Sequence, residues 1–249
     1  MRFDVITLFP EMILESSSYG VTGKAIEQGT VGLSVWNPRD YTQDRHRTVD
    51  DRPYGGGPGM VMKYQPLCEA VDDAKLINKD ADCKVVYLSP QGKQITQDLL
   101  IDASKFSQII LVAGRYEGID ERFINSVCDD EWSLGDYVIS GGELAALVVI
   151  DSITRLIPGV LGDDDSAQQD SFMNGLLDTP HYTRPEQGDM GQVPNVLLSG
   201  NHKAIERWRM KQALGRTELR RPDLLKNLEL TAEQEALLKE FRNEVHESD

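Results

Sequence analysis

Three glycine-rich turns follow apolar runs in the first 150 residues, and their residue types suit a ligand pocket. They are residues 88–92 (LSPQG), 114–118 (GRYEG) and 139–143 (ISGGE). Glycine lets the backbone approach a ligand closely, and a turn before a helix offers N–H groups to a polar ligand. A plain tight turn is the alternative for each cluster alone. Because ligands of open α/β sheets bind beyond the carboxyl ends of the strands, the three turns together predict one pocket.

A fourth glycine run, residues 55–59, follows a charged stretch that contains Arg45, Arg47 and Arg52. A run of this kind fits a loop that closes over a substrate, because glycine adopts backbone angles that other residues avoid. A mobile surface turn is the alternative. The arginines favour the ligand-facing loop without identifying the ligand.

Several common catalytic motifs are absent from the sequence. It has no GxxxxGK[ST] phosphate loop, no HExxH, no GxSxG, and no GxGxxG after its first apolar run. The four histidines are dispersed, and the three cysteines are odd in number and form no CxxC pair. These absences argue against a metal hydrolase, a P-loop NTPase, a serine hydrolase, a zinc site and a disulfide framework.

The elements that must position these turns alternate along the chain. Apolar, β-branched runs predict strands at residues 3–8, 31–36, 84–88, 108–113 and 137–140, and helix-like stretches lie at 65–75, 95–106, 120–128 and 143–156. This alternation predicts an α/β domain with a largely parallel sheet. No apolar run approaches the roughly 20 residues of a membrane span, and no signal peptide is visible. We therefore expect a soluble cytoplasmic protein with no membrane partner.

The composition changes after residue 160. Residues 161–170 are acidic and weakly patterned, as in a linker, and helices are predicted at 203–214, 223–226 and 231–245. Thr231 is a candidate N-cap of the last helix, because Gln234 follows three residues later. This second part of the chain is expected to be small and helical.

Charge is distributed unevenly along this acidic chain. The sequence has 26 Lys and Arg against 41 Asp and Glu, a net charge of −15, which argues against indiscriminate nucleic-acid binding. Residues 202–226, the basic island, reverse the sign, with eight Lys or Arg, three Asp or Glu and a net charge of +5. A solvated helix face and a surface for RNA are both compatible with this island.

In combination, the blocks resemble one family. They are RHRTVDD (45–51), YGGGPGM (54–60), YLSPQG (87–92), GRYEGIDER (114–122), SLGDYVISGGE (133–143), LLDTPHYTRP (176–185), LSGNH (198–202) and LGRT (214–217). Their order and wording resemble the bacterial tRNA guanine-N1 methyltransferases of the SPOUT superfamily. Members of that family act on the guanosine immediately 3′ of the anticodon, position 37.

The resemblance implies a fold and an organisation. It implies an α/β SPOUT-type domain with a parallel sheet and a deep trefoil knot, plus a small helical C-terminal domain. Residues 1–160 are expected to form the knotted catalytic domain that binds S-adenosylmethionine, 161–175 a flexible linker with the catalytic aspartate, and 176–249 the helical tRNA-binding domain. It further implies a homodimer with active sites shared between subunits.

The resemblance also implies roles for individual residues. Asp170 matches the general base, and Arg155 matches the arginine that holds the guanine. The expected cofactor-binding residues are Tyr87, Leu88, Pro90, Gly114, Tyr116, Glu117, Ser133, Leu134, Gly135, Asp136, Tyr137, Val138, Ile139, Gly141 and Gly142. The expected tRNA contacts are His46, Tyr54, Gly57, Gly59, Ser199, Asn201, His202 and Arg209. A dependence on Mg²⁺ is also suggested, but no metal ligand set is visible in the sequence.

The implied chemistry is physically consistent. Guanine N1 carries a proton at neutral pH, so a carboxylate base is needed, and a guanidinium can stabilise the charge that moves to O6. No covalent intermediate is required, in agreement with the missing nucleophile motifs. Trp208 is compatible with the core or with stacking on a nucleotide. A non-catalytic, dimeric RNA-binding protein is the alternative function, and a phosphotransferase is disfavoured by the missing phosphate-loop lysine.

Overall fold

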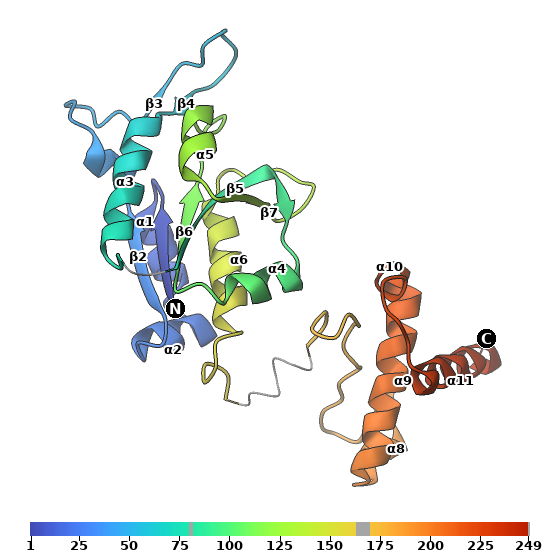
Figure 1. The fold of residues 1–249 in the computed structure, drawn as a ribbon. Coiled ribbons are helices and arrows are strands. Elements are labelled where there is room, and N and C mark those ends of the chain that lie inside the picture. The colour runs from blue at the N-terminus through green and yellow to red at the C-terminus, as the bar shows by residue number, and fades with distance from the viewer. Residues whose placement is uncertain (80–81, 163–169, 249) are drawn as a thin grey trace. The chain divides into compact units, whose positions relative to one another are not determined.

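The computed structural model describes residues 1–79, 82–162 and 170–248 (Figure 1). The chain folds as two compact units, residues 1–164 and 165–249. No helix within the described ranges is long and apolar enough to cross a membrane.

The first unit is built on a five-stranded parallel sheet (Figure 1). Its strands are β1 (Arg2–Ile6), β2 (Gly32–Trp36), β5 (Cys83–Gln94), β6 (Gln108–Ala113) and β7 (Asp130–Ser133), in the order β2-β1-β6-β5-β7. Every pairing in this sheet is parallel. The prediction of an α/β unit with a parallel sheet is therefore confirmed.

Alternating residues of the central strands face two separate cores. On β6, Ile109 and Leu111 pack in one core, whereas Ile110 and Val112 pack in the other. The first core lies against α1 (Pro10–Ser16), α2 (Gly20–Glu27), α4 (Gln97–Ala103) and α6 (Glu143–Thr154), and the second lies against α3 (Tyr64–Leu76) and α5 (Glu121–Val127). Burial on both faces explains why β5 and β6 contain continuous apolar runs.

Shorter elements connect the sheet to a projecting loop. They are a 3₁₀ turn, η1 (Pro38–Tyr41), and the antiparallel pair of β3 (Asp50–Asp51) and β4 (Val61–Met62). This pair closes the glycine loop at residues 52–60, which projects from the unit (Figure 1).

One predicted strand of the first unit is wrong, and one predicted helix is shorter than expected. Residues 137–140 do not form a strand, and the last strand is Asp130–Ser133 instead. Val138 is 87% exposed, so this short apolar run does not enter the sheet. The helix predicted at 95–106 is shorter, because β5 continues to Gln94 and the Thr96 hydroxyl caps α4 by accepting from the Leu99 N–H at 3.3 Å.

The second unit is mainly helical. It contains the short pair β8 (Gln187–Gly188) and β9 (Gly191–Gln192), then α8 (Asn195–Leu198), α9 (His202–Arg220), α10 (Pro222–Leu225) and α11 (Ala232–Ser248). Helix α9 continues past the predicted end at residue 214. Gly215 provides room there for the Phe241 ring of α11, which occupies the space that a side chain would need. Close packing of the two helices therefore outweighs the low helix propensity of glycine.

The start of α11 follows the predicted capping box. The Thr231 hydroxyl accepts a hydrogen bond from the Gln234 N–H at 3.2 Å, and the Gln234 side chain accepts one from the Thr231 N–H at 2.9 Å. The core of this unit contains Leu214 of α9, Leu237 and Leu238 of α11, and Leu176 from the preceding segment.

Candidate active site

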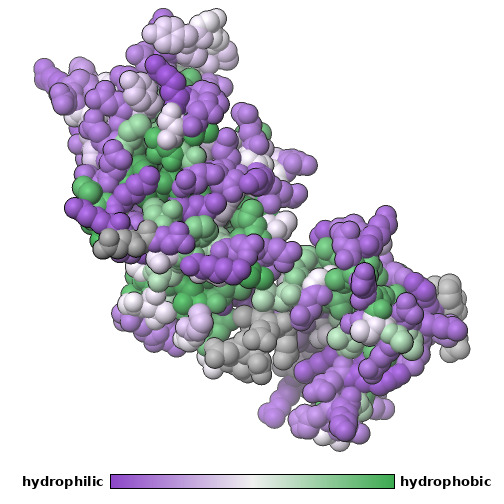
Figure 2. Space-filling view, viewed as in Figure 1, coloured by the Kyte–Doolittle hydropathy of each residue, from purple (hydrophilic) through white to green (hydrophobic). Residues whose placement is uncertain are grey.

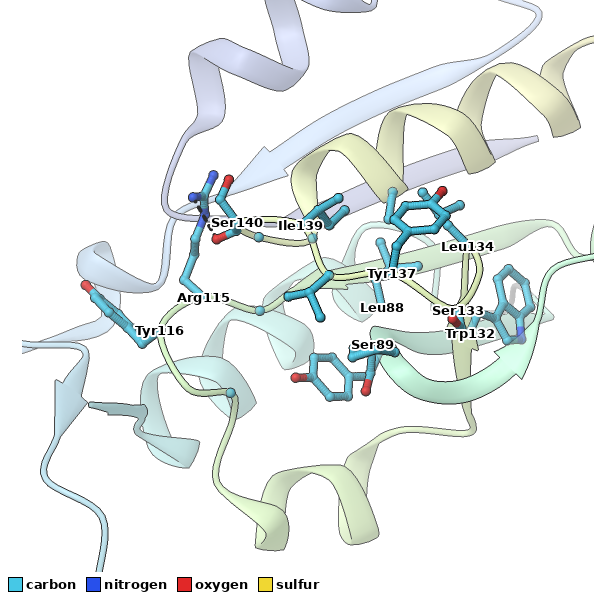
Figure 3. Close-up of a pocket in the computed structure, with 18 of the residues that line it drawn as sticks. Leu88, Ser89, Arg115, Tyr116, Trp132, Ser133, Leu134, Tyr137, Ile139 and Ser140 are labelled. Atoms are coloured by element: carbon cyan, nitrogen blue, oxygen red, sulfur yellow. Dashed lines mark hydrogen bonds between the residues drawn. The ribbon is translucent and has the colours of Figure 1, made fainter. Parts of the chain in front are cut away.

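A cavity of about 260 Å³ lies where β6 and β7 end, beside the middle of β5. Its walls come from residues 87–90, 114–118, 132–135 and 137–142 and from Ala145 of α6 (Figure 3). The structure thus brings residues of all three predicted turns together, although residues 88–92 lie within β5 and do not form a separate turn, and Gly92 is not among the lining residues. The lining includes Tyr87, Leu88, Pro90, Gly114, Tyr116, Glu117, Ser133, Leu134, Gly135, Tyr137, Val138, Ile139, Gly141 and Gly142.

The predicted and observed linings differ at a few positions. Asp136 is not among the lining residues. Six further residues line the cavity without having been predicted: Ser89, Arg115, Gly118, Trp132, Ser140 and Ala145. Ser89, Arg115, Gly118 and Ser140 lie within the glycine-rich blocks. The blocks could therefore have predicted these four as lining residues. Trp132 precedes its block by one residue and gave no local signal.

Two glycines let the pocket walls approach each other. A Cβ atom built on Gly114 would lie 2.9 Å from the Tyr87 ring, and one built on Gly142 would lie 2.6 Å from the Ala113 Cα. The Gly142 N–H donates to the Gly114 carbonyl at 3.0 Å, which joins the second and third turns. Any side chain at these positions would push the walls apart, so the glycines are needed for the shape of the cavity.

Tyr87 forms part of the cavity floor and remains a neutral phenol. Burial, followed by the negative charge of Glu131, raises the pKa of Tyr87 to about 12. The side chain is only 7% exposed. Tyr87 therefore offers an aromatic surface and an uncharged hydroxyl across the physiological pH range.

A buried network fixes the wall that contains Arg115. The Arg115 guanidinium donates to the Glu143 carboxylate and, at 3.1 Å, to the Ser140 carbonyl, beside which Figure 3 shows it. The Thr7 hydroxyl donates to the other Glu143 oxygen at 2.8 Å and accepts from the Phe9 N–H at 2.9 Å. Arg115 also lies over the Phe9 ring, 4.4 Å from its centre. The end of β1, the second turn and the third turn are held together in this way.

The predicted tRNA contacts in the first unit lie on the projecting loop and beside it. Tyr54 is fully exposed, and the turn that contains His46 is closed by the Asp44 carboxylate, which accepts from the His46 N–H at 3.1 Å. Gly57 and Gly59 have positive φ angles of 116° and 77°. The structure places these residues at the surface and does not test their role.

The predicted tRNA contacts in the second unit gather at the start of α9. Asn201 caps this helix by accepting from the Ala204 N–H at 3.3 Å, and the Ser199 hydroxyl accepts from the Asn201 N–H at 3.2 Å. His202 is the first residue of α9, and Arg209 lies two turns further along. Ser199 and Asn201 therefore shape the helix start, whatever else they contact.

Arg155 belongs to the first unit and Asp170 to the second. Arg155 is half-buried at the C-terminal end of α6, where its N–H donates to the Asp151 carbonyl at 3.1 Å. Asp170 begins a turn in which its carbonyl accepts from the Met173 N–H at 3.3 Å. The neighbouring residues 163–169, predicted as part of the linker, lie outside the described residues.

The turn that begins at Asp170 is attached to the core of the second unit. The Phe172 N–H donates to the Leu176 carbonyl at 2.7 Å, and Phe172 has a φ of 76°. Leu176 is 8% exposed and packs with Leu214 of α9. The next residue, Leu177, donates its N–H to the buried Thr217 hydroxyl at 2.9 Å. Asp170 is thus six residues from a firmly packed anchor.

Asp170 also lines a second cavity, of about 340 Å³, within the second unit. Its lining includes Asp178, His181, Arg209 and Met210. Burial raises the pKa of Asp178, but the hydrogen bonds from His181 and from the Thr179 N–H lower it by more. The pKa of Asp178 therefore lies below its usual value. The His181 Nε2 lies 2.8 Å from the Asp178 carboxylate. A carboxylate, an imidazole and a guanidinium therefore line one cavity, together with apolar side chains such as Met210.

The basic island is partly neutralised by neighbouring acidic residues. Arg207 pairs with Glu240 of α11, Lys211 pairs with Glu244, and Arg221 pairs with Asp223. Within the described part of the chain, Lys203, Arg209, Arg216 and Arg220 form no ion pair within 4 Å. Trp208 is half-buried, and its ring lies 6.4 Å from that of Tyr182.

No cluster of three His, Cys, Asp or Glu side chains that could hold a metal ion occurs in the described ranges. The residues present therefore give no support for a Mg²⁺ site.

Comparison with known proteins identifies close relatives over the whole chain. Residues 1–227 match the profile of the family described as tRNA (Guanine-1)-methyltransferase TrmD. A protein of Shewanella sediminis is 61% identical over 241 residues, 97% of this chain and 99% of its own length. Proteins of Shewanella halifaxensis and a Marinomonas strain are 57% and 59% identical, and each match covers 100% of this chain and at least 98% of the relative. All three are named tRNA (guanine-N(1)-)-methyltransferase.

Proposed function

Because the chain belongs to the tRNA (guanine-N1)-methyltransferase family and is a methyltransferase, we propose that S-adenosylmethionine is its methyl donor and N1 of guanosine 37 in tRNA its target. The observation that carries the proposal is the cavity at the ends of β6 and β7, where residues 114–118 and 137–142 meet residues 87–90 of β5. A cavity at this position is the usual ligand site of an open α/β sheet.

The residues of this cavity fit an adenosyl cofactor. Leu88, Leu134 and Ile139 provide apolar surface, and the backbone at Gly114 and Gly142 is open to close approach. When bound, S-adenosylmethionine would supply a methyl group attached to a positively charged sulfur. The chain's own contribution is to hold the donor, exclude water and place the guanine in line with it, because positioning is a major part of such catalysis.

Asp170 and Arg155 are proposed to act on the guanine. The Asp170 carboxylate would accept the N1 proton, for which it must come within roughly 3 Å of N1. The Arg155 guanidinium would donate hydrogen bonds to O6, where negative charge collects as the proton leaves. The target base must leave its stack to reach these groups, at a cost of a few kcal/mol. The chain itself would form no covalent bond to the methyl group, which the bound donor would supply to N1 as its methyl C–S bond breaks.

We also propose the deep trefoil knot and the homodimer with shared active sites that the family implies. The hydrogen bond between the second and third turns supports close packing of the segments that a knot would entwine. Exposed apolar residues support a second copy on the face formed by α1 and α6. They are Phe9, Leu14, Leu144 and Val148, each between 45% and 48% exposed, and Figure 2 shows hydrophobic residues at the surface over α6.

The dimer has its own test. Val148→Glu adds a charge to the exposed face of α6, so it should shift the sedimentation of the protein toward the monomer while leaving its fold intact by circular dichroism. Glu27→Gln, a change at the end of α2, is the matched control. A Val148→Glu protein that sediments like the wild type would reject this face as the interface.

Labelled methyl transfer tests the function directly. Purified protein should transfer a labelled methyl group from S-adenosylmethionine to a tRNA whose guanosine follows an anticodon ending in G, and nucleoside analysis should give 1-methylguanosine. A folded dimer that gives no such product with a matching tRNA would refute the proposal. Calorimetry separates the alternative, because a non-catalytic RNA-binding protein would bind tRNA without stoichiometric uptake of the cofactor.

A further inference from the structure

The projecting glycine loop and the cavity wall are joined by backbone hydrogen bonds. The Glu117 N–H donates to the Met60 carbonyl at 2.9 Å, and the Met62 N–H donates to the Gly118 carbonyl at 2.9 Å. Met62 is 1% exposed and pairs with Ile119 as an isolated parallel bridge. The loop that reaches into solvent and the turn that lines the cavity therefore form one continuous structure.

Side-chain packing also crosses this junction at Gly59. A Cβ atom built on Gly59 would lie 2.7 Å from the Glu117 carboxyl carbon and closer still to its Cγ and Oε1. The Glu117 side chain therefore occupies the space that a side chain at position 59 would need. Gly56, in the same loop, differs, because a Cβ atom there would meet nothing within 4 Å.

We propose that Gly59 is a positioning residue for the Glu117 carboxylate, and that it thereby couples the projecting loop to the cofactor cavity. Glu117 lines that cavity, so a shift of the loop alters the position of its carboxylate and backbone there. The identity of the two ligands rests on the proposed function: the cofactor fills the cavity and tRNA contacts the loop. Coupling between two sites is reciprocal, so each ligand should change the affinity for the other by the same factor.

The two glycines provide a matched pair of variants. Their φ angles are 77° at Gly59 and 78° at Gly56, so alanine imposes a similar backbone cost at either position. Only Gly59→Ala also displaces Glu117. By calorimetry in the absence of tRNA, Gly59→Ala should raise the dissociation constant for S-adenosylmethionine by at least about threefold over Gly56→Ala, a coupling typical of residues in contact. Equal constants for the two variants would overturn the proposal.

A double-mutant cycle tests whether Gly59 acts through Glu117. In a Glu117→Ala background, the carboxylate is gone, so Gly59→Ala should cause no further loss of cofactor affinity than Gly56→Ala does. If the losses from Gly59→Ala and Glu117→Ala instead multiply as independent effects, Gly59 does not act through Glu117 and the proposal is wrong.

A second measurement needs no substitution at position 59. The tRNA dissociation constant of the wild-type protein should change when saturating S-adenosylhomocysteine is present, and Glu117→Ala should bring that ratio close to one. An unchanged ratio in Glu117→Ala contradicts the proposal. Methyl transfer by the wild-type protein is assayed in parallel. Its failure would refute the proposed function, whereas the cofactor-binding cycle would still decide the role of Gly59.

Discussion

The Arg115 guanidinium lies 2.8 Å from the carboxylate of Glu143, whose side chain has no exposed surface. A buried carboxylate needs both charge and hydrogen-bond partners, because removal from water is costly. Arg115 serves one oxygen and Thr7 the other. Since Arg115 and Ser140 both line the cavity, the buried pair maintains the geometry of the proposed cofactor site.

Thr7→Val should destabilise the Arg115–Glu143 side of the cavity, because it removes the hydroxyl with little change in side-chain volume. It leaves one Glu143 oxygen and the Phe9 N–H without their hydrogen-bond partner, so we expect the free energy of unfolding to fall by about 1 to 3 kcal/mol. The dissociation constant for S-adenosylmethionine should rise with it, as measured by calorimetry. Thr7→Ser keeps the hydroxyl and should retain most of the cofactor affinity. Equal cofactor affinity in the valine and serine variants would contradict a positioning role.

Asp170→Asn should abolish most turnover and leave the cofactor cavity intact. The amide has nearly the shape of the carboxylate but cannot serve as the base, and general base catalysis contributes about 10²- to 10⁴-fold to rate. Single-turnover methylation should slow by that factor, while calorimetry gives an unchanged dissociation constant for S-adenosylmethionine. Asp164→Asn is the control for a loss of linker charge. Wild-type rates in Asp170→Asn would reject the base assignment.

The salt dependence of tRNA binding should depend on those Lys and Arg side chains of the basic island that form no ion pair within the described part of the protein. Joint replacement of Lys203, Arg209, Arg216 and Arg220 by Gln should reduce the slope of log K against log salt concentration. The expected reduction is about 0.7 to 0.9 for each cation that contacts a phosphate. Arg207→Gln is the matched control, because Glu240 already pairs with this arginine at 3.0 Å. If the fourfold variant keeps the wild-type slope, the basic island is a solvated helix face.

The ion pair between Glu218 of α9 and Arg242 of α11 should stabilise the protein only above acidic pH. The hydrogen bond from Arg242 lowers the pKa of Glu218 below its ordinary value of 4.5. A carboxylate with a depressed pKa contributes stability above the pKa of the unfolded state, and this contribution is lost as the pH falls through the folded-state value. Both side chains are partly exposed, so the contribution should be below about 1 kcal/mol.

Denaturant unfolding as a function of pH checks this expectation. Glu218→Gln should be less stable than the wild type at pH 7, and the difference should shrink toward zero below about pH 4. Glu229→Gln, a change at another exposed glutamate, provides the control. A Glu218→Gln deficit that stays constant down to pH 3 would show that lost packing, and not the ion pair, is responsible.

The parts of the fold that were predictable are those with a strong local signal. Strands β5 and β6 are buried on both faces, and each contains a continuous apolar run, residues 85–88 and 109–113. Strand β7 was missed because it begins with Asp130 and Glu131 at the edge of the sheet. Helices α1 and α2 were not predicted either. Serines 16–18 and the glycines at 20 and 23 are typical of loops, but packing against α6 overrides that local preference.

The site shows a similar division between local and distant information. The glycine turns were visible in the sequence because close backbone approach requires glycine at particular positions. The partnership of Thr7 with Glu143 was not visible, because 136 residues separate them and only the folded sheet brings them together. Gly59 was predicted as a tRNA contact, a role that the structure does not test, and its packing against Glu117 appeared only in three dimensions.

Trp132 is an intrinsic fluorophore of the first unit. The chain has three tryptophans, of which Trp132 lines the proposed cofactor cavity, Trp36 ends β2 and Trp208 lies on α9. The Trp132 indole is 2% exposed, so its emission should change when a ligand alters the polarity of the cavity. Replacement of Trp36 and Trp208 by Phe would leave a single fluorophore. Cofactor occupancy could then be followed in real time, in the same cuvette in which tRNA is added.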